Sequence, residues 1–409
     1  MGLSSCFLRG RPRFMCLCNS TVSISITGVK WYHVSMSNKR PKVVIIGGGA
    51  TGTGIARLAA EQGMEVVLIE RGAIGSGTSS RFHGILHSGA RYAVADPGVA
   101  AECYQENQTL RSYIPTAITD TGGLFVALTD QEAAHADTVQ QACRAAGIPF
   151  KELSRQAVLS LEPKLNPSLV RAFTVPDGFI DGTTLLDINQ QAAQQATVPA
   201  RFLTNRRVMG FKRNGQTITA VSVRHASSNT IEDIACDYVV NAAGVWAGEV
   251  ANLASIHLAM LYDKCTMIIF KEQFTSSVIN RCRPEDDGDL LVPHDGQSIM
   301  GTTSRVITDP DDYDPTQEEA DVLVREGTLL VPDMAQAEAL RIYSGVRPLQ
   351  AVGDMQHGSR AVSRSFKVLD HSDQGVDNII SVVGGKVTLY RLMAEAAVQA
   401  LRAKSGYTS

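Results

Sequence analysis

The chain has 409 residues, of which 44% are hydrophobic, and its formal net charge is -3. A chain of this length can bury a large core and form two domains, and its slightly acidic balance argues against a general nucleic-acid binder. No uninterrupted apolar run is long enough to span a bilayer, and the eight cysteines include no CxxC pair, which argues against a metal or iron–sulfur site in this chain.

The first 35 residues differ in composition from the rest of the chain. They carry four basic residues, no acidic residue and three of the eight cysteines. Such N-termini can be targeting peptides, but polar residues interrupt the apolar portion, and Met36 opens a second natural-looking start. We therefore expect residues 1–40 to be a disordered or mis-started extension, with a transit peptide as the alternative.

Residues 42–70 form the unit around which the remaining chain is organised. An apolar run over 43–46 leads into three consecutive glycines, a helical pattern follows, and a second apolar run over 66–69 ends on Glu70. This pattern predicts a strand, a turn, a helix and a second strand, with glycines at the spacing of a dinucleotide-binding fingerprint. The fingerprint glycines are Gly47, Gly49 and Gly52.

Each fingerprint glycine has a predicted task. Gly47 allows the tight turn, Gly49 lets a pyrophosphate approach the backbone, and Gly52 lets helix and strand pack closely. The start of the helix offers free N–H groups to the phosphates, and Glu70 can accept hydrogen bonds from ribose hydroxyls. An ordinary strand–helix–strand crossover is the alternative, and the unit alone leaves open which dinucleotide binds.

Two polar stretches follow the second strand. Residues 75–80, which include Ser79 and Ser80, are rich in hydroxyl groups and suit phosphate contact, although a solvated loop is the alternative. Residues 81–92 hold two histidines, two arginines and a tyrosine among small residues. Because glycines lie between them, we expect the backbone there to approach a ligand closely.

The middle of the chain alternates helices with short strands. From 201 to 234, alternating segments and two turns predict a β-meander, and a strand over 237–241 then enters a turn that contains Ala243 and Gly244 and should return to the nucleotide sheet. Before the meander, we expect a helix over 97–114, a strand over 122–128, a helix over 131–146, an amphipathic segment over 154–163, a turn-rich stretch over 175–182 and a helix over 184–196.

The last third adds more strands and ends in a helix. The final predicted strand enters a glycine turn over 384–388, so the nucleotide domain is discontinuous, because the chain leaves it and returns. We expect strands over 266–270, 290–292, 298–301, 342–348, 361–369 and 379–383, an acidic turn over 309–315, and helices over 317–330 and 389–403.

The glycine turn near the end of the chain favours a flavin over a nicotinamide. Reduction of a flavin places negative charge on the ring edge that carries a carbonyl, and a helix start with a lysine would stabilise that charge. Gly384, Gly385, Lys386 and Thr388 form such a turn. A plain strand-to-helix turn is the alternative explanation.

Four basic residues lie near glycines or strand ends rather than in surface charge runs. Arginine suits the bidentate binding of a phosphate or a carboxylate, so the set predicts an anionic substrate, although each residue alone could be a surface charge. The four are Arg91, Arg347, Arg364 and Lys386.

On these residues, the chain resembles the FAD-dependent glycerol-3-phosphate dehydrogenases, in particular their anaerobic-type A subunits. The resemblance covers nearly all of residues 42–403 in order, and three of its motifs in combination are specific. The matching stretches are VVIIGGGATGTGIA (43–56), HGILHSGARYAV (83–94), VVNAAGVWA (239–247), INRCR (279–283), LLVPHDG (290–296), GTTS (301–304), REGTLLVPDM (325–334), YSGVRPL (343–349), AVSRSF (361–366) and GGKVTLYRLMAEAA (384–397).

The resemblance implies an α/β fold with a discontinuous, glutathione-reductase-like FAD-binding domain of the Rossmann type and a substrate domain on a mixed sheet. It implies non-covalent FAD and oxidation of sn-glycerol 3-phosphate to dihydroxyacetone phosphate, with electrons passed to quinone directly or through partner subunits. The expected location is cytoplasmic, with peripheral attachment to the inner face of the plasma membrane through partners. The expected domains are 41–115, 195–255 and 345–405 for FAD, and 116–194 and 256–344 for substrate.

The resemblance also carries site residues over, motif by motif. His87, Arg347 and Lys386 are the expected catalytic residues, with His87 as candidate base and Arg347 as the alternative group that polarises the forming ketone. The expected substrate contacts are Arg91, Tyr92, Arg347, Arg364 and Lys386. The expected FAD contacts are Gly47, Gly49, Gly52, Glu70, Ser79, Ser80, Ala243, Gly244, Gly384, Gly385, Lys386 and Thr388. No metal is expected.

At three points the sequence departs from the family pattern, and these departures leave other functions possible. Cys265 stands where the family has a glycine after its lysine, Gly182 replaces a proline, and no cysteine follows Cys282, although the family's A subunits continue into a cysteine-rich domain. An iron–sulfur relay would then belong to a partner or be absent. The alternatives are a glycerol-phosphate, amine or amino-acid oxidase on the same fold, or an inactive flavin-binding protein.

Overall fold

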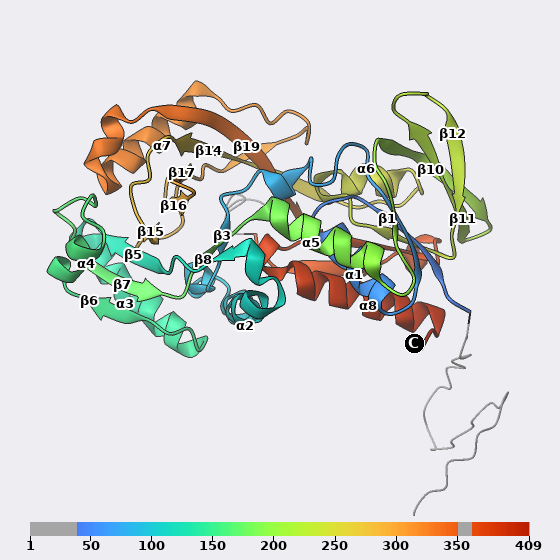
Figure 1. The fold of residues 1–409 in the computed structure, drawn as a ribbon, viewed down its shortest axis with the longest axis horizontal. Helices are drawn as coiled ribbons and strands as arrows, with labels where there is room; N and C mark the ends of the chain where they lie inside the picture. Colours follow the sequence, from blue (N-terminus) through green and yellow to red (C-terminus); the bar gives the residue numbers. More distant parts are fainter. Residues whose placement is uncertain (1–38, 351–361, 409) are drawn as a thin grey trace, which may run out of the picture.

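The computed structural model of the chain describes residues 39–350 and 362–408. Residues 1–38 of the extension predicted over 1–40 lie outside the described residues, as does residue 361 of the strand predicted over 361–369. Two large sheets organise the structure, and they occupy opposite halves of the view in Figure 1. Two smaller three-stranded sheets complete the described fold. Within this part of the chain, no helix combines the length and the apolar character that crossing a membrane requires.

The first large sheet has six strands in the order β20-β21-β13-β1-β2-β9. All neighbours are parallel except β20 and β21. β1 and β2 are continuous apolar runs because both faces of a parallel sheet are covered. The strands are β1 (Lys42–Ile46), β2 (Glu65–Ile69), β9 (Arg201–Leu203), β13 (Tyr238–Asn241), β20 (Phe366–Asp370) and β21 (Ile379–Gly384).

Helices cover one face of this sheet and a meander covers the other. On one face, Ile55 of α1 (Ala50–Glu61) packs in a single core with Val43 and with Val398 of α8 (Tyr390–Ser405). α5 (Gly182–Gln195) lies against α1. The opposite face packs on α6 (Ala247–Asn252) and on the antiparallel sheet of β10 (Arg206–Asn214), β11 (Thr217–His225) and β12 (Ile231–Ala235).

The second large sheet has nine strands and is mixed. β5 and β15 are parallel, and the other pairs are antiparallel. α4 (Arg155–Leu161) and α7 (Gln317–Leu330) share one core with it, and α3 (Asp130–Ala145) shares another. The strands are β5 (Gly123–Ala127), β6 (Lys151–Leu153), β7 (Arg171–Val175), β14 (Met260–Phe270), β15 (Val278–Arg281), β16 (Leu290–His294), β17 (Gln297–Gly301), β18 (Arg305–Ile307) and β19 (Ala339–Gln350).

A small sheet supports the histidine-rich stretch. Its strands are β3 (Ile85–Leu86), β8 (Gly178–Ile180) and β4 (Ile118–Thr119), and α2 (Pro97–Tyr113) packs beside it. The start of α2 follows from its sequence, because the Asp96 side chain accepts a hydrogen bond from Val99 N–H and Pro97 occupies the first helical position. Such a cap contributes about 1 kcal/mol to helix stability.

The predicted fold class is confirmed, whereas several element assignments need correction. β9 was expected in the meander, but it pairs in parallel with β2. β8 forms where only turns were expected, since it is three residues long and depends on partners distant in sequence. β14 and β19 extend well beyond the predicted segments because they pair with each other along nearly their whole length. The proposed domain boundaries stay a prediction.

Candidate functional site

A cavity of about 540 Å³ lies at the carboxyl ends of β1, β2, β13 and β21, where β14 and β19 of the second sheet meet the first. This is the edge at which open α/β sheets bind their ligands. Most of the predicted site residues line it. They are Gly47, Gly49, Glu70, Ser79, His87, Tyr92, Ala243, Gly244, Arg347, Arg364, Gly384, Gly385 and Lys386.

The turn after β1 has room only for glycine. Gly47 has a φ of 112°, and a Cβ there would lie 2.4 Å from the carbonyl oxygen of Ala242. Gly52 does not line the cavity. A Cβ at Gly52 would lie 1.9 Å from the Gly47 carbonyl oxygen, so a residue without a Cβ lets α1 start directly against the turn. The start of α1 thus faces the cavity with amides suited to a phosphate group.

Two hydroxyl groups of the stretch after β2 have different positions. Ser79 Oγ accepts a hydrogen bond from Ala50 N–H at 2.9 Å and lines the cavity. Ser80 Oγ donates to the Gly75 carbonyl at 2.7 Å and is not among the lining residues. Ser79 therefore stabilises the helix start directly, while Ser80 closes its own loop.

Glu70 is fixed at the end of β2 by backbone amides. Its Oε2 accepts a hydrogen bond from Gly48 N–H at 2.7 Å, and its Oε1 accepts one from Gly72 N–H at 2.8 Å. A carboxylate has about four acceptor positions. Glu70 can therefore bind a ribose hydroxyl while it holds the glycine turn in place.

The C-terminal glycine turn contacts the histidine-rich stretch directly. Gly384 and Gly385 have φ values of 78° and 76°, which few other residues adopt. Thr388 Oγ1 accepts a hydrogen bond from His87 N–H at 3.2 Å, and Thr388 itself is buried behind the cavity wall. Two motifs separated by 301 residues are thereby joined at one wall of the cavity.

The cations of the cavity differ in how they are held. Arg347 donates to Asp263 at 2.6 Å and to Thr302 Oγ1 at 2.8 Å. Arg364 lies 3.7 Å from Asp263, and its Nη1 is buried without a hydrogen-bond partner in the described residues. Asp263 is fully buried and therefore orients both guanidinium groups.

Lys386, like Arg364, has a buried nitrogen atom without a hydrogen-bond partner among the described residues. Its Nζ lies 3.3 Å from the centre of the Tyr92 ring and makes no hydrogen bond within the described part of the chain. Burial lowers the pKa of this ammonium group from 10.5 to about 8. An anion in the cavity would supply the hydrogen-bond acceptor that Lys386 Nζ and Arg364 Nη1 lack among the described residues.

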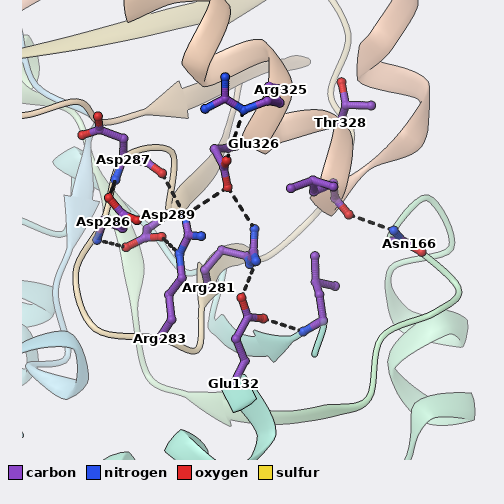
Figure 2. Close-up of polar contacts among 12 residues, drawn as sticks. Glu132, Asn166, Arg281, Arg283, Asp286, Asp287, Asp289, Arg325, Glu326 and Thr328 are labelled. Atoms are coloured by element: carbon purple, nitrogen blue, oxygen red, sulfur yellow. Dashed lines mark hydrogen bonds and ion pairs between the residues drawn. The ribbon is translucent and has the colours of Figure 1, made fainter. Parts of the chain in front are cut away.

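Arg91 is not brought to the cavity lining. Its guanidinium group donates to Asp289 at 2.9 Å and lies 3.6 Å from Glu285. Asp289 is fully buried and also pairs with Arg283 at 2.6 Å, as Figure 2 shows. A phosphate contact for Arg91 stays a prediction, and this geometry does not support it.

A histidine and an aspartate at this site were not predicted from the sequence. His83 lines the cavity, and its ring centre lies 5.4 Å from that of His87. Tyr92 Oη lies 3.3 Å from His87 Nε2, and burial, followed by the nearby His83, lowers the pKa of His87 well below its usual value. The four-residue spacing between His83 and His87 is a sequence signal that could have identified His83. Asp263 has no such local signal beyond its position two residues before Cys265.

Two of the departures from the family pattern have a structural explanation. Cys265 lies inside β14, paired with Gly345, and is not among the residues with positive φ, so its side chain costs no backbone strain. At Gly182, a Cβ would lie 2.4 Å from the Ser79 carbonyl oxygen. Asp181 still caps α5 by accepting from Thr184 N–H at 2.6 Å. The helix therefore starts firmly without the proline.

The residues present fit a flavin dinucleotide. The Gly47 turn and the start of α1 suit the pyrophosphate, Glu70 suits the ribose, and the unpartnered Lys386 beside two glycines suits the flavin ring or a bound anion.

Comparison with known proteins agrees with this site. The family model described as FAD dependent oxidoreductase matches residues 42–391. The chain is 43% identical over 369 residues to the A component of anaerobic glycerol-3-phosphate dehydrogenase from Escherichia coli strain K12, and the match covers 90% of this chain and 68% of that protein. It is 39% identical to the A1 component of the same enzyme from Haloferax volcanii, over 87% of this chain and 62% of that protein.

A solved structure supports the fold. L-alpha-glycerophosphate oxidase from Mycoplasma pneumoniae, which has FAD bound, superposes with a TM-score of 0.71 at 20% identity, over 89% of this chain and 95% of that one. The cofactor is FAD, as the family model indicates. The chain therefore belongs to the FAD-dependent oxidoreductase family and, within it, is similar to the A subunits of anaerobic glycerol-3-phosphate dehydrogenase.

Proposed function

We propose that the chain oxidises sn-glycerol 3-phosphate to dihydroxyacetone phosphate. The observation that carries the proposal is the pair of buried cationic atoms, Arg364 Nη1 and Lys386 Nζ, that face one cavity without a hydrogen-bond partner among the residues described. A buried donor without a hydrogen bond is costly, and a phosphate dianion would accept hydrogen bonds from both atoms. The similarity to the A subunits of glycerol-3-phosphate dehydrogenase points to the same substrate.

In this proposal, each residue has a separate task. Arg364 and Lys386 bind the phosphate group, and Arg347, held by Asp263, binds the oxygen on the carbon that is oxidised. FAD, when bound, accepts the hydride from that carbon. His87 takes the hydroxyl proton; burial lowers the pKa of its ring, which leaves the ring neutral and free to accept a proton but also makes it a weaker base. Tyr92 supports His87 through the contact between Oη and Nε2.

The fate of the electrons is part of the same proposal. We propose that they pass to quinone, directly or through partner subunits, because the relatives of this chain are named as A subunits of anaerobic enzymes. Attachment to the inner face of the plasma membrane would then be provided by those partners. Reoxidation of the reduced protein by a quinone analogue, at a rate well above that with oxygen, is the expected result.

Anaerobic bleaching tests the proposed function. The purified protein should be yellow, and sn-glycerol 3-phosphate should remove its absorbance in the visible range in the absence of oxygen. Glycerol, which lacks the phosphate, is the matched control and should bleach the protein at least 100-fold less efficiently, on the order expected for losing a buried ion pair of about 3 kcal/mol. A yellow protein that glycerol 3-phosphate leaves unbleached would refute the proposal and favour an inactive flavin-binding protein.

A further inference from the structure

His83 is a cavity residue to which the proposed function gives no task. It lines the same cavity as His87 and Arg347, and its ring stands nearly perpendicular to that of His87, at 82°. The two rings lie close enough for both to reach one small substrate. The nitrogen atoms of the two rings, however, have different hydrogen-bond partners, and this difference gives each histidine a different chemical role.

One nitrogen of His83 is used by its own loop. His83 Nδ1 accepts a hydrogen bond from Ile85 N–H at 3.1 Å. A ring nitrogen that accepts a hydrogen bond carries no proton, so the proton of the neutral ring is on Nε2. Among the residues that the structure describes, Nε2 has no hydrogen-bond partner. His83 therefore offers an N–H donor from its outer edge and has no lone pair there to act as a base.

The surroundings keep the His83 ring neutral. Burial, and then the positive charges of Arg347 and Arg91, lower the pKa of His83 from 6.5 to about 3. His87, Lys386, Tyr92 and Cys265 are further titratable groups that line the cavity. The ring of His83 is consequently neutral at pH values well above 3, so that Nε2 donates a hydrogen bond without adding a positive charge that would attract the phosphate.

We propose that His83 is a catalytic residue that donates a hydrogen bond from Nε2 to the oxygen on the carbon that is oxidised. This assignment rests on the proposed function. Negative charge develops on that oxygen as its proton leaves for His87, and a fixed neutral donor stabilises the developing charge more than it stabilises the alcohol. His83 thus lowers the barrier together with Arg347, while Arg364 and Lys386 determine how tightly the phosphate binds.

Two substitutions distinguish the roles of the two ring nitrogens of His83. In His83→Asn, the side-chain oxygen occupies about the place of Nδ1 and can still accept from Ile85 N–H, but the outer donor is lost. In His83→Gln, the amide nitrogen reaches about the place of Nε2 and keeps a donor. The first variant therefore preserves the loop and removes the proposed chemistry, and the second preserves the chemistry.

The measurement is the limiting rate of anaerobic bleaching by glycerol 3-phosphate and the concentration that gives half of it. We expect His83→Asn to bleach about 100-fold more slowly at saturation, with the half-saturating concentration and the FAD content unchanged within about threefold. The limiting rate of His83→Gln should be at least about tenfold higher than that of His83→Asn.

Three outcomes would overturn the assignment. His83→Asn with a wild-type limiting rate would show that no donor is needed. Equal losses in both variants, together with equal falls in melting temperature, would show that His83 only shapes the loop. A wild-type protein that is yellow yet not bleached would remove the proposed function and this assignment together, whereas the first two outcomes leave the proposed function standing.

Discussion

Lys386 is the cation of the cavity whose charge depends on pH near neutrality. Burial lowers its pKa to about 8, so the ammonium group is charged below that pH and neutral above it. Because only the charged form attracts a phosphate, the KM for glycerol 3-phosphate should rise by at least about tenfold between about pH 7 and about pH 9.5. Steady-state assays with an artificial electron acceptor across this range measure the rise.

Lys386→Arg is the matched variant for this pH effect, since arginine stays protonated throughout the range. Its KM should be nearly independent of pH, even if the longer side chain raises the value itself. A wild-type KM that stays flat up to about pH 9.5 would mean that Lys386 does not bind the phosphate as a titrating cation.

Gly52 is the residue at which a single methyl group should abolish cofactor binding. A Cβ there would lie 1.9 Å from the Gly47 oxygen, and the nearby backbone cannot move without opening the turn. We expect Gly52→Ala to be purified colourless or to aggregate. Gly98→Ala, at a helical glycine whose nearest neighbour would lie 4.0 Å away, should stay yellow, and visible absorbance per protein compares the two.

At the scale of elements, a series of ion pairs joins three elements of and around the second large sheet. Figure 2 shows Arg281 of β15 between Glu132 of α3 and Glu326 of α7. Arg283 continues the series from Glu326 at 3.1 Å to Asp289 at 2.6 Å. Since Asp289 also holds Arg91, the network connects α7 to the loop that carries Tyr92 beside the cavity.

Removing the charge of Asp289 should destabilise the protein more than it alters substrate binding. Asp289 is fully buried, and breaking a buried pair by neutralising one partner costs about 3–5 kcal/mol. We expect Asp289→Asn to lower the free energy of unfolding in urea by about 3 kcal/mol, with FAD content retained after gentle purification. Asp295→Asn, at an exposed carboxylate, is the control and should change stability by less than about 0.5 kcal/mol.

A large rise in KM for Asp289→Asn, without a change in the free energy of unfolding, would contradict this expectation. It would indicate that Arg91 contacts the phosphate directly when substrate is bound and that Asp289 only holds it in the meantime. The urea midpoint and the KM, measured on the same preparation, separate these two meanings.

At the scale of the whole molecule, an acidic loop from the second sheet reaches the cofactor side of the cavity. Asp311 lies between β18 and α7 and accepts hydrogen bonds from Arg71 at 3.2 Å and from Trp246 Nε1 at 3.0 Å. Arg71 in turn stacks on the Trp246 ring at 3.6 Å, and both residues line the cavity. One carboxylate therefore joins the two halves at the mouth of the dinucleotide site.

Asp311→Asn should make FAD leave faster. The contacts are largely exposed, and exposed pairs contribute about 1 kcal/mol or less, so the expected increase in the FAD dissociation rate is about two- to fivefold. Release of FAD into a large excess of an apoflavoprotein trap, followed by fluorescence, measures this rate. Asp312→Asn changes the neighbouring carboxylate and should leave the rate unaltered.

The sequence predicted the glycine turns and the elements beside them well because those features depend on neighbours in the chain. The β1 turn, Glu70 and the Gly384 turn all lie at the cavity for that reason. The partners of Arg91 and Arg347 were not predictable, since Asp289 is 198 residues from Arg91 and Asp263 is 84 residues from Arg347. Only tertiary packing decides whether an arginine faces a ligand or a carboxylate.

The order of strands in the six-stranded sheet has a consequence for how the protein is made. β1 and β2 leave the ribosome early, but β13 and then β21, with Lys386 behind it, come from much later parts of the chain. Until β13 is synthesised, one edge of β1 has no native partner, and an open strand edge invites association with other chains. The six-stranded sheet and its cofactor site can therefore be complete only after β21 and Lys386 have been synthesised, and the unpaired edge of β1 persists for as long as the chain takes to grow from β2 to β13.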